Sequence, residues 1–540
     1  MKKIFKYTLV IAASLAAMSC TRNFLEYNTD PFGATDEEME RDGYSVRAAL
    51  LGLCDGIIAL DVNTTQFTEA LLGGPMAGYL ADANAGFNDN TIGRFNPPNN
   101  WTKVLMEDFP KRIYPNLRQL EKVTSDKAII AVGQVIKVAG MHRIADTYGP
   151  MPYSQIGEDG ALQVPFDSQE KAYKTMIEEL DLAISVLEEN LSNNFAASAD
   201  IIFGGDVEKW CRYANSLKLR LAMRMSYADP SYARKKAEEV AAHEIGTMAG
   251  AGDIAQLTTF GADGNPLYVA VNYNRRSVHD GEDEDGQPCT STGDSHAAAD
   301  IILYMNGYND PRRAVYFTPS EWEGTDFVGL RHGIEIPDHK SVGHKYSGIN
   351  LTRFDSPIIL MTPAEAAFLK AEATAVFGWN MGGTAKDFYE EGIRLSFEQW
   401  GVAGAETYMS DISAVPGTYD DPAGSNSYNN KLTNLPVAWD DAAGVEEKQE
   451  RILIQKWIAN FPLGNESWAD IRRTGYPHIL PCEESADNSH GQVPLSGPRR
   501  LKFPQEEYTS NAENVNYAVS NLLGGPDVMS TRLWFDCKNQ

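Results

Sequence analysis

Apolar residues recur at helical spacing along most of this 540-residue chain, and this pattern constrains the fold more than any other feature. The stretch 167–191, DSQEKAYKTMIEELDLAISVLEENL, shows the pattern best. Asp167 and Glu170 have the spacing of a capping box at its start. The apolar residues that share one face, at steps of three and four, are Ile177, Leu180, Ile184 and Leu187. This stretch is predicted to form an amphipathic helix that packs on a core.

Similar spacing predicts further helices along the chain, at 44–60, 101–124, 127–147, 206–228, 231–245, 363–379, 384–400 and 444–461. Thr362 and Glu365 form a second capping box, and Pro363 suits the first helical position. We therefore expect a mostly α fold with helix pairs stacked like tetratricopeptide repeats, although no strict 34-residue repeat is visible.

A change of composition divides the chain without a linker, so one large domain over 20–540 is expected. Residues 246–356 are rich in Gly, Asn, Asp, Tyr and Pro and have few periodic segments. They are predicted to be a loop-rich insertion between a mainly helical part, 20–245, and a helical scaffold with C-terminal loops, 357–540. Loops of this length in a compact protein are usually functional or disordered, and the interleaved aromatic residues favour function.

The first twenty residues, MKKIFKYTLVIAASLAAMSC, have the pattern of a bacterial secretion signal. A basic segment is followed by a short apolar run, Tyr7 to Ala17, and then by small residues and a cysteine. We expect a signal peptide over 1–19 and lipidation of Cys20. The alternative is a plain signal peptide with an incidental cysteine, because Ala17-Met18-Ser19 is a loose lipobox.

The net charge of −27 argues against nucleic acid and anionic membrane surfaces as partners. No stretch after the leader has the 18 apolar residues of a membrane span, and the run 128–141 is predicted to be a buried helix. Contact with the membrane is therefore expected through the lipid alone. Apart from Cys20, an odd number of widely spaced cysteines remains, predicted to be buried free thiols: Cys54, Cys211, Cys289, Cys482 and Cys537.

Recognised catalytic motifs are absent: there is no HExxH, GxSxG or P-loop. Gly250 to Ala255 matches G-x-G-x-x-A but follows a helical segment rather than a strand, so no dinucleotide site is predicted. His332, His339 and His344 fit no metal-ligand spacing and are interpreted as surface histidines of a polar loop. The acidic run 280–286 misses the EF-hand register; a loose calcium site is the alternative to a solvated charge run. No cofactor and no catalysis are expected.

Aromatic and amide residues alternate in two stretches, 78–101 and 267–277. Sugar rings stack their C–H faces on aromatic side chains, and their hydroxyls pair with Asn, Asp and Arg. This composition suits a shallow carbohydrate site, but it is also the composition of ordinary loops.

Several segments, in this order, resemble the SusD/RagB family of outer-membrane nutrient-binding lipoproteins of Bacteroidetes, in particular the branch described as SusD-like, starch-binding, associating with the outer membrane. The segments are NFLEYNTDP, IADTYGPMPYSQ, the stretch 167–191, YMNGYNDPRRAVYF, PIILMTPAEAAFLKAEA, YEEGIRLSFEQWGV, ILIQKWIANF, WADIRRTGYP, RRLKFPQEEYTSNAENVNYA and LGGPDVMSTRLWFD. The resemblance implies tetratricopeptide-like helix pairs packed against a loop-rich ligand-binding half. It also implies a non-enzymatic lipoprotein on the outer face of the outer membrane.

The resemblance further implies that the protein binds glycans, or peptides, and hands them to a SusC-like TonB-dependent transporter. A ligand-free scaffold of the transporter complex and a surface glycoside hydrolase are the alternatives. The residues of a family motif near 468–477 are interpreted as structural, forming an Asp/Arg network and a helix end: Trp468, Asp470, Arg472, Arg473, Gly475 and Pro477. Position and chemistry give the predicted ligand-binding residues, which are Tyr79, Asp82, Phe87, Asn88, Trp101, Tyr273, Arg275 and Trp322.

Overall fold

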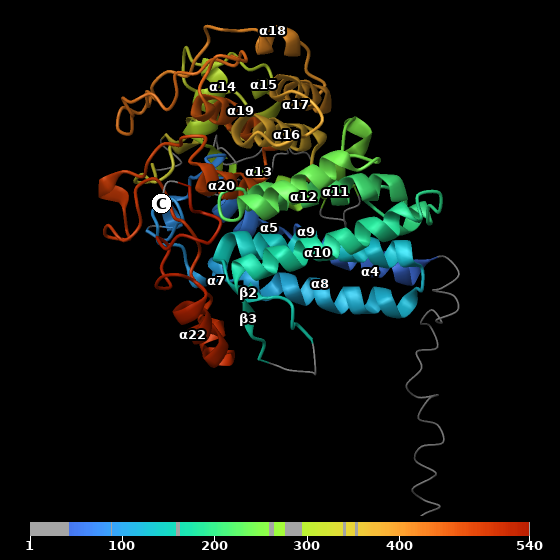
Figure 1. Ribbon diagram of the computed structural model, residues 1–540. Coiled ribbons are helices and arrows are strands. Elements are labelled where there is room, and N and C mark those ends of the chain that lie inside the picture. Colours follow the sequence, from blue (N-terminus) through green and yellow to red (C-terminus); the bar gives the residue numbers. More distant parts are fainter. Residues whose placement is uncertain are drawn as a thin grey trace, which may run out of the picture.

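The structure of the protein is a computed structural model, in which most elements are helices (Figure 1). The residues that it describes are 43–87, 89–157, 163–258, 264–275, 294–337, 342–350 and 355–538. The leader with Cys20, and also Asn88, the acidic run 280–286, Cys289 and His339, lie outside the described residues.

Long helices that follow one another in the sequence pack side by side in a helical layer, drawn in blue and green in Figure 1. Its members are α4 (Tyr44–Cys54), α8 (Val104–Val123), α9 (Lys127–Tyr148), α10 (Gln169–Glu188), α11 (Val207–Arg224) and α12 (Pro230–Ala242). Each helix from α8 to α12 contacts the next one along the chain. This antiparallel pairing confirms the predicted mostly α fold.

A second group of helices, drawn in orange and red in Figure 1, lies beside this layer. It contains α16 (Pro363–Phe377), α17 (Ala385–Gln399), α19 (Val445–Asn460) and α20 (Gly464–Thr474). Helix α16 packs on both α17 and α19, while α20 contacts α9 and α11 and so joins the two groups.

Of the two predicted helix caps, the one at Thr362 is confirmed and the one at Asp167 is wrong. Thr362 caps α16 as predicted, since its Oγ1 accepts a hydrogen bond from the Glu365 amide at 3.2 Å. Helix α10 instead begins after Ser168, whose Oγ accepts from the Lys171 amide at 3.1 Å. The capping box predicted at Asp167 is wrong because Asp167 pairs with Met151 in a short two-stranded sheet.

The described strands form three two-stranded antiparallel sheets. The pairs are β1 (Leu80–Asp82) with β5 (Ser295–Ala297), β2 (Met151–Pro152) with β3 (Phe166–Asp167), and β4 (Ala255–Leu257) with β6 (Ile358–Met361). Two of these sheets join the stretch 246–356 to the rest of the chain. The described part of that stretch also contains the α-helices α13 (Pro266–Arg275), α14 (Ala299–Gly307) and α15 (Arg313–Tyr316).

The remaining short elements connect these groups. They are α5 (Val62–Thr65), the π-helix η1 (Gln66–Gly73), α6 (Gly74–Met76), η2 (Ala85–Phe87), α7 (Asn99–Thr102), η3 (Ala197–Ala199), η4 (Ala251–Asp253), η5 (Gly343–Lys345), α18 (Ala405–Met409), η6 (Glu484–Ala486), α21 (Gln505–Ser510) and α22 (Ala512–Asn521).

Two large hydrophobic cores hold the structure together. The first lies within the helical layer and contains Val132, Leu180 and Leu217, while the second lies around α14 and α16–α19 and contains Phe368 and Trp457. Among the described residues, α9 is the one helix long and apolar enough to cross a membrane, and 89% of its most apolar stretch is buried inside the protein. It packs as the predicted buried helix.

The cysteines that the structure describes are free thiols, as predicted. Cys54, Cys211 and Cys482 are buried, and Cys537 is half-buried.

Candidate functional site

Three aromatic side chains from separate short helices meet at one place, and we call them the aromatic cluster. Phe67 of η1 stacks on Trp101 of α7 with ring centroids 5.9 Å apart and an angle of 19° between the planes. Phe87 of η2 meets the same indole edge-on, at 5.1 Å and 78°. Trp101 is only 7% exposed, whereas Phe67 and Phe87 are partly exposed. The two phenyl rings therefore keep part of their apolar surface exposed while they pack on the buried indole.

Polar groups border the aromatic cluster. Asp294 lies directly before β5 and accepts hydrogen bonds from Gln66 Nε2 at 2.9 Å and from Asn84 Nδ2 at 2.6 Å. Burial raises the pKa of Asp294, although the bonds from Asn84 and Gln66 counteract the effect. Because Gln66 directly precedes Phe67 and Asn84 directly precedes η2, this network fixes the two segments that present the phenyl rings.

Of the residues predicted in the first stretch, the structure brings Phe87 and Trp101 together and places Tyr79 elsewhere. Trp101 is buried, so its predicted ligand contact is corrected to packing against the two phenyl rings. Tyr79 is fully buried, its ring stacks on Trp457 at 5.5 Å, and its hydroxyl donates to the Trp457 carbonyl and lies 2.7 Å from Ser467 Oγ. The predicted ligand contact of Tyr79 is therefore corrected to a core role, because no face of the ring reaches the surface.

Asp82, at the end of β1, is likewise buried, with 5% of its surface exposed. Burial raises the pKa of this carboxyl to about 6, against the opposing effects of Thr91, the Gly93 amide and His332. The predicted ligand contact of Asp82 is therefore corrected to a buried position. A carboxylate in such a place destabilises the fold when it ionises.

We expect Asp82→Asn to make the protein more stable than wild type at pH 8, by roughly 2–3 kcal/mol at most. The folded pKa of Asp82 is raised, so its contribution to stability is fully present below the unfolded value of 3.8 and is lost as the pH rises through about 6. Urea unfolding of both proteins between pH 4 and pH 8 measures this, and the difference should vanish at the acid end. A constant difference across that range would show that Asp82 does not titrate in this way.

The residues predicted in the second region lie in two places. Helix α13 carries Tyr273 and Arg275 and packs against α5, β5 and η1, the element that holds Phe67. The side chains of Tyr273 and Arg275 lie outside the described residues. Trp322 is half-buried and belongs to a different contact, in which its ring meets Tyr346 edge-on at 5.8 Å and the Lys345 ammonium at 4.9 Å.

The sequence prediction missed Phe67, Gln66 and Asp294. Phe67 and Gln66 lie outside the two aromatic and amide-rich stretches, in a π-helix that has no simple sequence signal. Asp294 reaches Gln66 across 228 residues of chain. Local spacing carries no information on such a contact.

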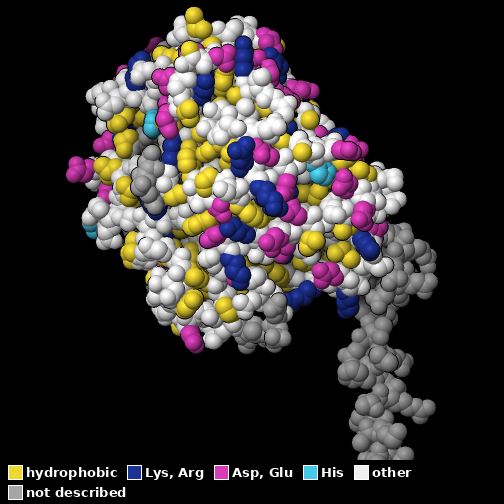
Figure 2. Space-filling view, in the orientation of Figure 1, with side chains coloured by type: hydrophobic (Ala, Val, Ile, Leu, Met, Phe, Trp, Pro, Cys, Tyr) yellow, Lys and Arg dark blue, Asp and Glu magenta, His cyan; other side chains and the backbone are white. Residues whose placement is uncertain are grey.

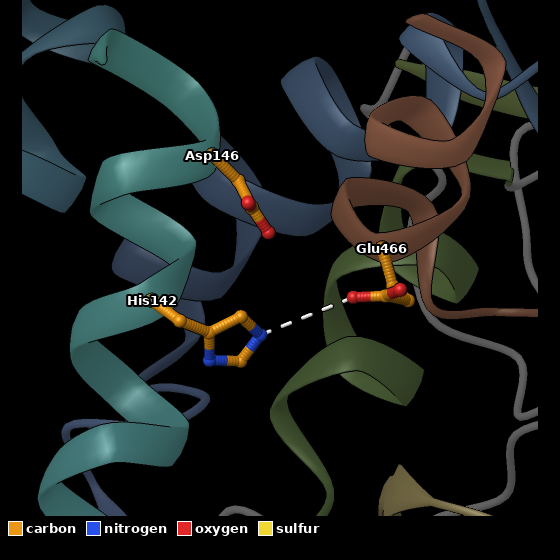
Figure 3. Close-up of side chains that lie close together, drawn as sticks. All are labelled: His142, Asp146 and Glu466. Atoms are coloured by element: carbon orange, nitrogen blue, oxygen red, sulfur yellow. Dashed lines mark ion pairs between the residues drawn. The ribbon is translucent and has the colours of Figure 1, made fainter. Parts of the chain in front are cut away.

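A buried cluster of His142, Asp146 and Glu466 has the residue types and proximity of a metal site, since their ligand atoms lie within 4.8 Å of one another. Figure 3 shows His142 and Asp146 on one helix, with His142 Nε2 facing Glu466 at 3.9 Å. However, Arg224 donates to both carboxylates, with 3.1 Å from Nε to Asp146 and 2.7 Å from Nη2 to Glu466. A cation already occupies the position between the acids, so the cluster belongs to an ion-pair network.

We call this network the buried ion network. Its members, which come from α9, α11, α16, α19 and α20, are Asp146, Arg220, Arg224, Glu365, Glu372, Lys456, Glu466, Asp470 and Arg473. Arg473 lies 2.7 Å from Glu372 and 3.0 Å from Asp470, and α20 ends at Gly475 in the left-handed conformation (φ 87°). These contacts agree with the Asp/Arg network and helix end predicted for 468–477.

The predicted histidine loop differs from expectation at His332. This side chain is buried, and its Nδ1 lies 3.0 Å from Asp300 Oδ2, while His344 lies 3.3 Å from Glu321. Each of these two histidines has its own carboxylate partner, so they do not converge on a shared metal position.

Charged side chains on the surface are mixed in sign over the helical layer (Figure 2). Lys218 lies 2.5 Å from Asp181, and Lys236 lies 2.6 Å from the same carboxylate. The acidic net charge therefore does not form a single patch over α10–α12.

The family model for SusD-like proteins, described as SusD and RagB outer membrane lipoproteins, matches residues 26–536. A solved SusD homologue from Bacteroides uniformis is 48% identical, with a TM-score of 0.86 over 91% of this chain and 99% of that chain. A chitin-binding SusD homologue from Flavobacterium johnsoniae is 33% identical, with a TM-score of 0.83 over 92% of this chain and 99% of its own. A homologue from Bacteroides ovatus is 37% identical, with a TM-score of 0.82 over 92% and 100%. The curated proteins contain no match.

Proposed function

This chain belongs to the SusD-like family of outer-membrane lipoproteins, and on that premise we propose that it binds glycans at the cell surface. The observation that carries the proposal is the aromatic cluster, in which two partly exposed phenyl rings lie beside amide and carboxylate groups. Stacking on the rings and hydrogen bonding at their border are the two interactions that a sugar ring needs. The chitin-binding relative favours a glycan over a peptide as the first ligand to test.

The proposal includes a lipid anchor at Cys20, exposure on the cell exterior, and delivery of the ligand to a SusC-like TonB-dependent transporter. The leader and the family support these parts. A lipid anchor keeps the binding protein in the same membrane as its transporter, which raises the effective concentration of the binding protein near the transporter.

Binding without catalysis is the proposed activity. Glycoside hydrolysis needs one carboxylic acid and one carboxylate that both reach the sugar. Asp82 has the raised pKa of an acid but is buried, and both oxygens of Asp294 accept hydrogen bonds from amide groups. Neither carboxyl is placed as a sugar hydrolase requires.

We expect Phe67→Ala and Phe87→Ala each to weaken glycan binding about tenfold, the effect of losing roughly 1.4 kcal/mol of stacking and apolar burial. Titration calorimetry with chitin oligosaccharides, and with maltooligosaccharides and peptides in parallel, measures the affinity. Tyr517→Ala is the matched control, because Tyr517 is an exposed aromatic residue on α22 and its loss should leave the affinity unchanged.

Unchanged glycan affinity in both phenylalanine variants would show that the glycan does not bind at the aromatic cluster. A wild-type protein that binds a SusC-like barrel but no glycan or peptide would be the ligand-free scaffold. New reducing ends after incubation with polysaccharide would identify a hydrolase.

A further inference from the structure

A cavity of about 300 Å³ lies where the two large cores meet, and Phe67, Phe87 and Trp101 of the aromatic cluster do not line it. Its apolar walls include Ile58, Ile358, Ile359 and Leu463, which belong to the first core, and Leu267, which packs on the second. Trp400 also lines the cavity and packs against both cores. Ligand sites of soluble proteins are concave, mostly apolar and commonly placed where two units meet, with volumes from about 300 Å³ upward. The cavity has these properties.

We propose that this cavity is a second ligand site, separate from the glycan site, and that it takes an uncharged, mainly apolar small molecule with one hydroxyl, of the class of aromatic alcohols. The polar groups that reach the cavity indicate this class of ligand.

Glu69 supplies the acceptor. It lines the cavity, is only 6% exposed, and accepts one hydrogen bond from Arg143 and one, at 3.1 Å, from Asn465 Nδ2. Because each carboxylate oxygen has a further lone pair, Glu69 is able to accept one more donor. Arg143 neutralises its charge, so the cavity attracts neither a cation nor an anion.

Gln399, at the end of α17, supplies a donor. Its Nε2 is buried and has no hydrogen-bond partner among the described residues. Two further amide side chains, Gln256 and Asn265, line the cavity. Asn265 is already used: its Nδ2 donates to the Ser356 carbonyl at 2.8 Å, and its Oδ1 accepts from the Leu267 and Tyr268 amides.

This small set of polar groups disfavours a sugar. A monosaccharide carries about five hydroxyls, and each one buried without a partner costs roughly 1–3 kcal/mol. A single hydroxyl that donates to Glu69 and accepts from Gln399 uses the acceptor and one of two buried donors without a partner among the described residues, Gln399 Nε2 and Trp400 Nε1. The rest of the ligand is then an apolar ring against the aliphatic walls and the Trp400 indole.

The test uses 4-ethylphenol, which is neutral, mainly apolar and carries one hydroxyl. Saturation-transfer NMR and calorimetry with the wild-type protein should give a dissociation constant on the order of 1 mM or tighter, as expected for nine non-hydrogen atoms. The ether 4-ethylanisole, which has no donor for Glu69, should bind at least about fivefold more weakly. No wild-type binding of 4-ethylphenol at 5 mM, or equal binding of the two compounds, would overturn the proposal.

Two variants locate the binding. Leu267→Trp places a larger side chain at a half-buried wall position and should reduce 4-ethylphenol binding more than about tenfold. Gln399→Leu removes the unpartnered amide without adding bulk and should weaken binding about fivefold. Ile412→Trp, at a position that is 80% exposed, is the control and should bind as the wild type does. If Leu267→Trp lowers the melting temperature, its weaker binding could come from unfolding, and Gln399→Leu then serves as the test. Wild-type affinity of Gln399→Leu for 4-ethylphenol would show that the probe binds outside this cavity.

Discussion

Replacing Arg224 with methionine is expected to lower the free energy of unfolding by about 3–5 kcal/mol, enough to leave the protein marginally folded at 37 °C. Arg224 is 1% exposed and lies within 3.2 Å of three carboxylates, those of Asp146, Glu466 and Asp470. Methionine fills a similar volume but leaves these carboxylates with fewer cations. The cost therefore comes from uncompensated buried charge and not from a cavity.

A surface pair gives the matched control. Arg234 lies 2.9 Å from Glu238 one helical turn away on α12, with its side chain 56% exposed. Arg234→Met should change the free energy of unfolding by less than about 0.5 kcal/mol, since exposed pairs are screened by water and salt. Guanidinium unfolding at pH 7 measures both variants. Equal losses of unfolding free energy in Arg224→Met and Arg234→Met would show that burial does not determine how much an ion pair contributes to stability.

The same network predicts a pH dependence. Burial opposes the ionisation of Glu466, but Arg224 and Arg220 outweigh it and hold the pKa of Glu466 well below its usual value. A depressed folded pKa gives stability that is present above the unfolded value, near 4.5, and is lost as the pH falls through the folded value. Without Arg224, Glu466 becomes easier to protonate. Acid unfolding of Arg224→Met should therefore begin at a higher pH than that of the wild type, which circular dichroism between pH 2 and pH 6 would record.

Sequence patterns predicted the helical scaffold well because the forces that define a helix are local. Periodicity placed α9 and α16 to within a few residues, and the cap at Thr362 needs only a hydroxyl and an amide three residues on. The error at Asp167 has the opposite origin, because pairing with Met151 in a distant segment removed that residue from the helix.

The candidate site was predicted only in part because contacts between distant segments create it. An aromatic residue in a loop-like stretch has the same local pattern whether it stays partly exposed, as Phe87 does, or is buried in the core, as Tyr79 is. Phe67 and Asp294 join the site through a π-helix and a sheet partner, neither of which spacing reveals. The cavity beside Glu69 depends on the meeting of two cores and has no counterpart in any single stretch.

Gly464→Ala is expected to cost about 2–4 kcal/mol of stability and to weaken glycan binding as well. Gly464 begins α20, and a Cβ there would lie 2.4 Å from the backbone C and O atoms of Gly73 and 2.7 Å from the Gly74 amide nitrogen. Backbone atoms have no rotamer in which to avoid the clash, so α20 and η1 must move apart. Since η1 carries Phe67, that movement displaces one ring of the aromatic cluster.

The control for this substitution is Gly444→Ala. Gly444 precedes α19 with φ −65°, and a Cβ there would meet no heavy atom within 4 Å. The stability of the Gly444→Ala protein should therefore stay within about 0.5 kcal/mol of wild type. Chemical unfolding gives the stability of each variant, and calorimetry with chitin oligosaccharides gives its affinity. A Gly464→Ala protein with wild-type stability would contradict the close approach of α20 to η1. A Gly464→Ala protein that is less stable but binds glycan with wild-type affinity would show that the aromatic cluster does not depend on this helix contact. The ring of Phe67 would then keep its position although the backbone of η1 had moved.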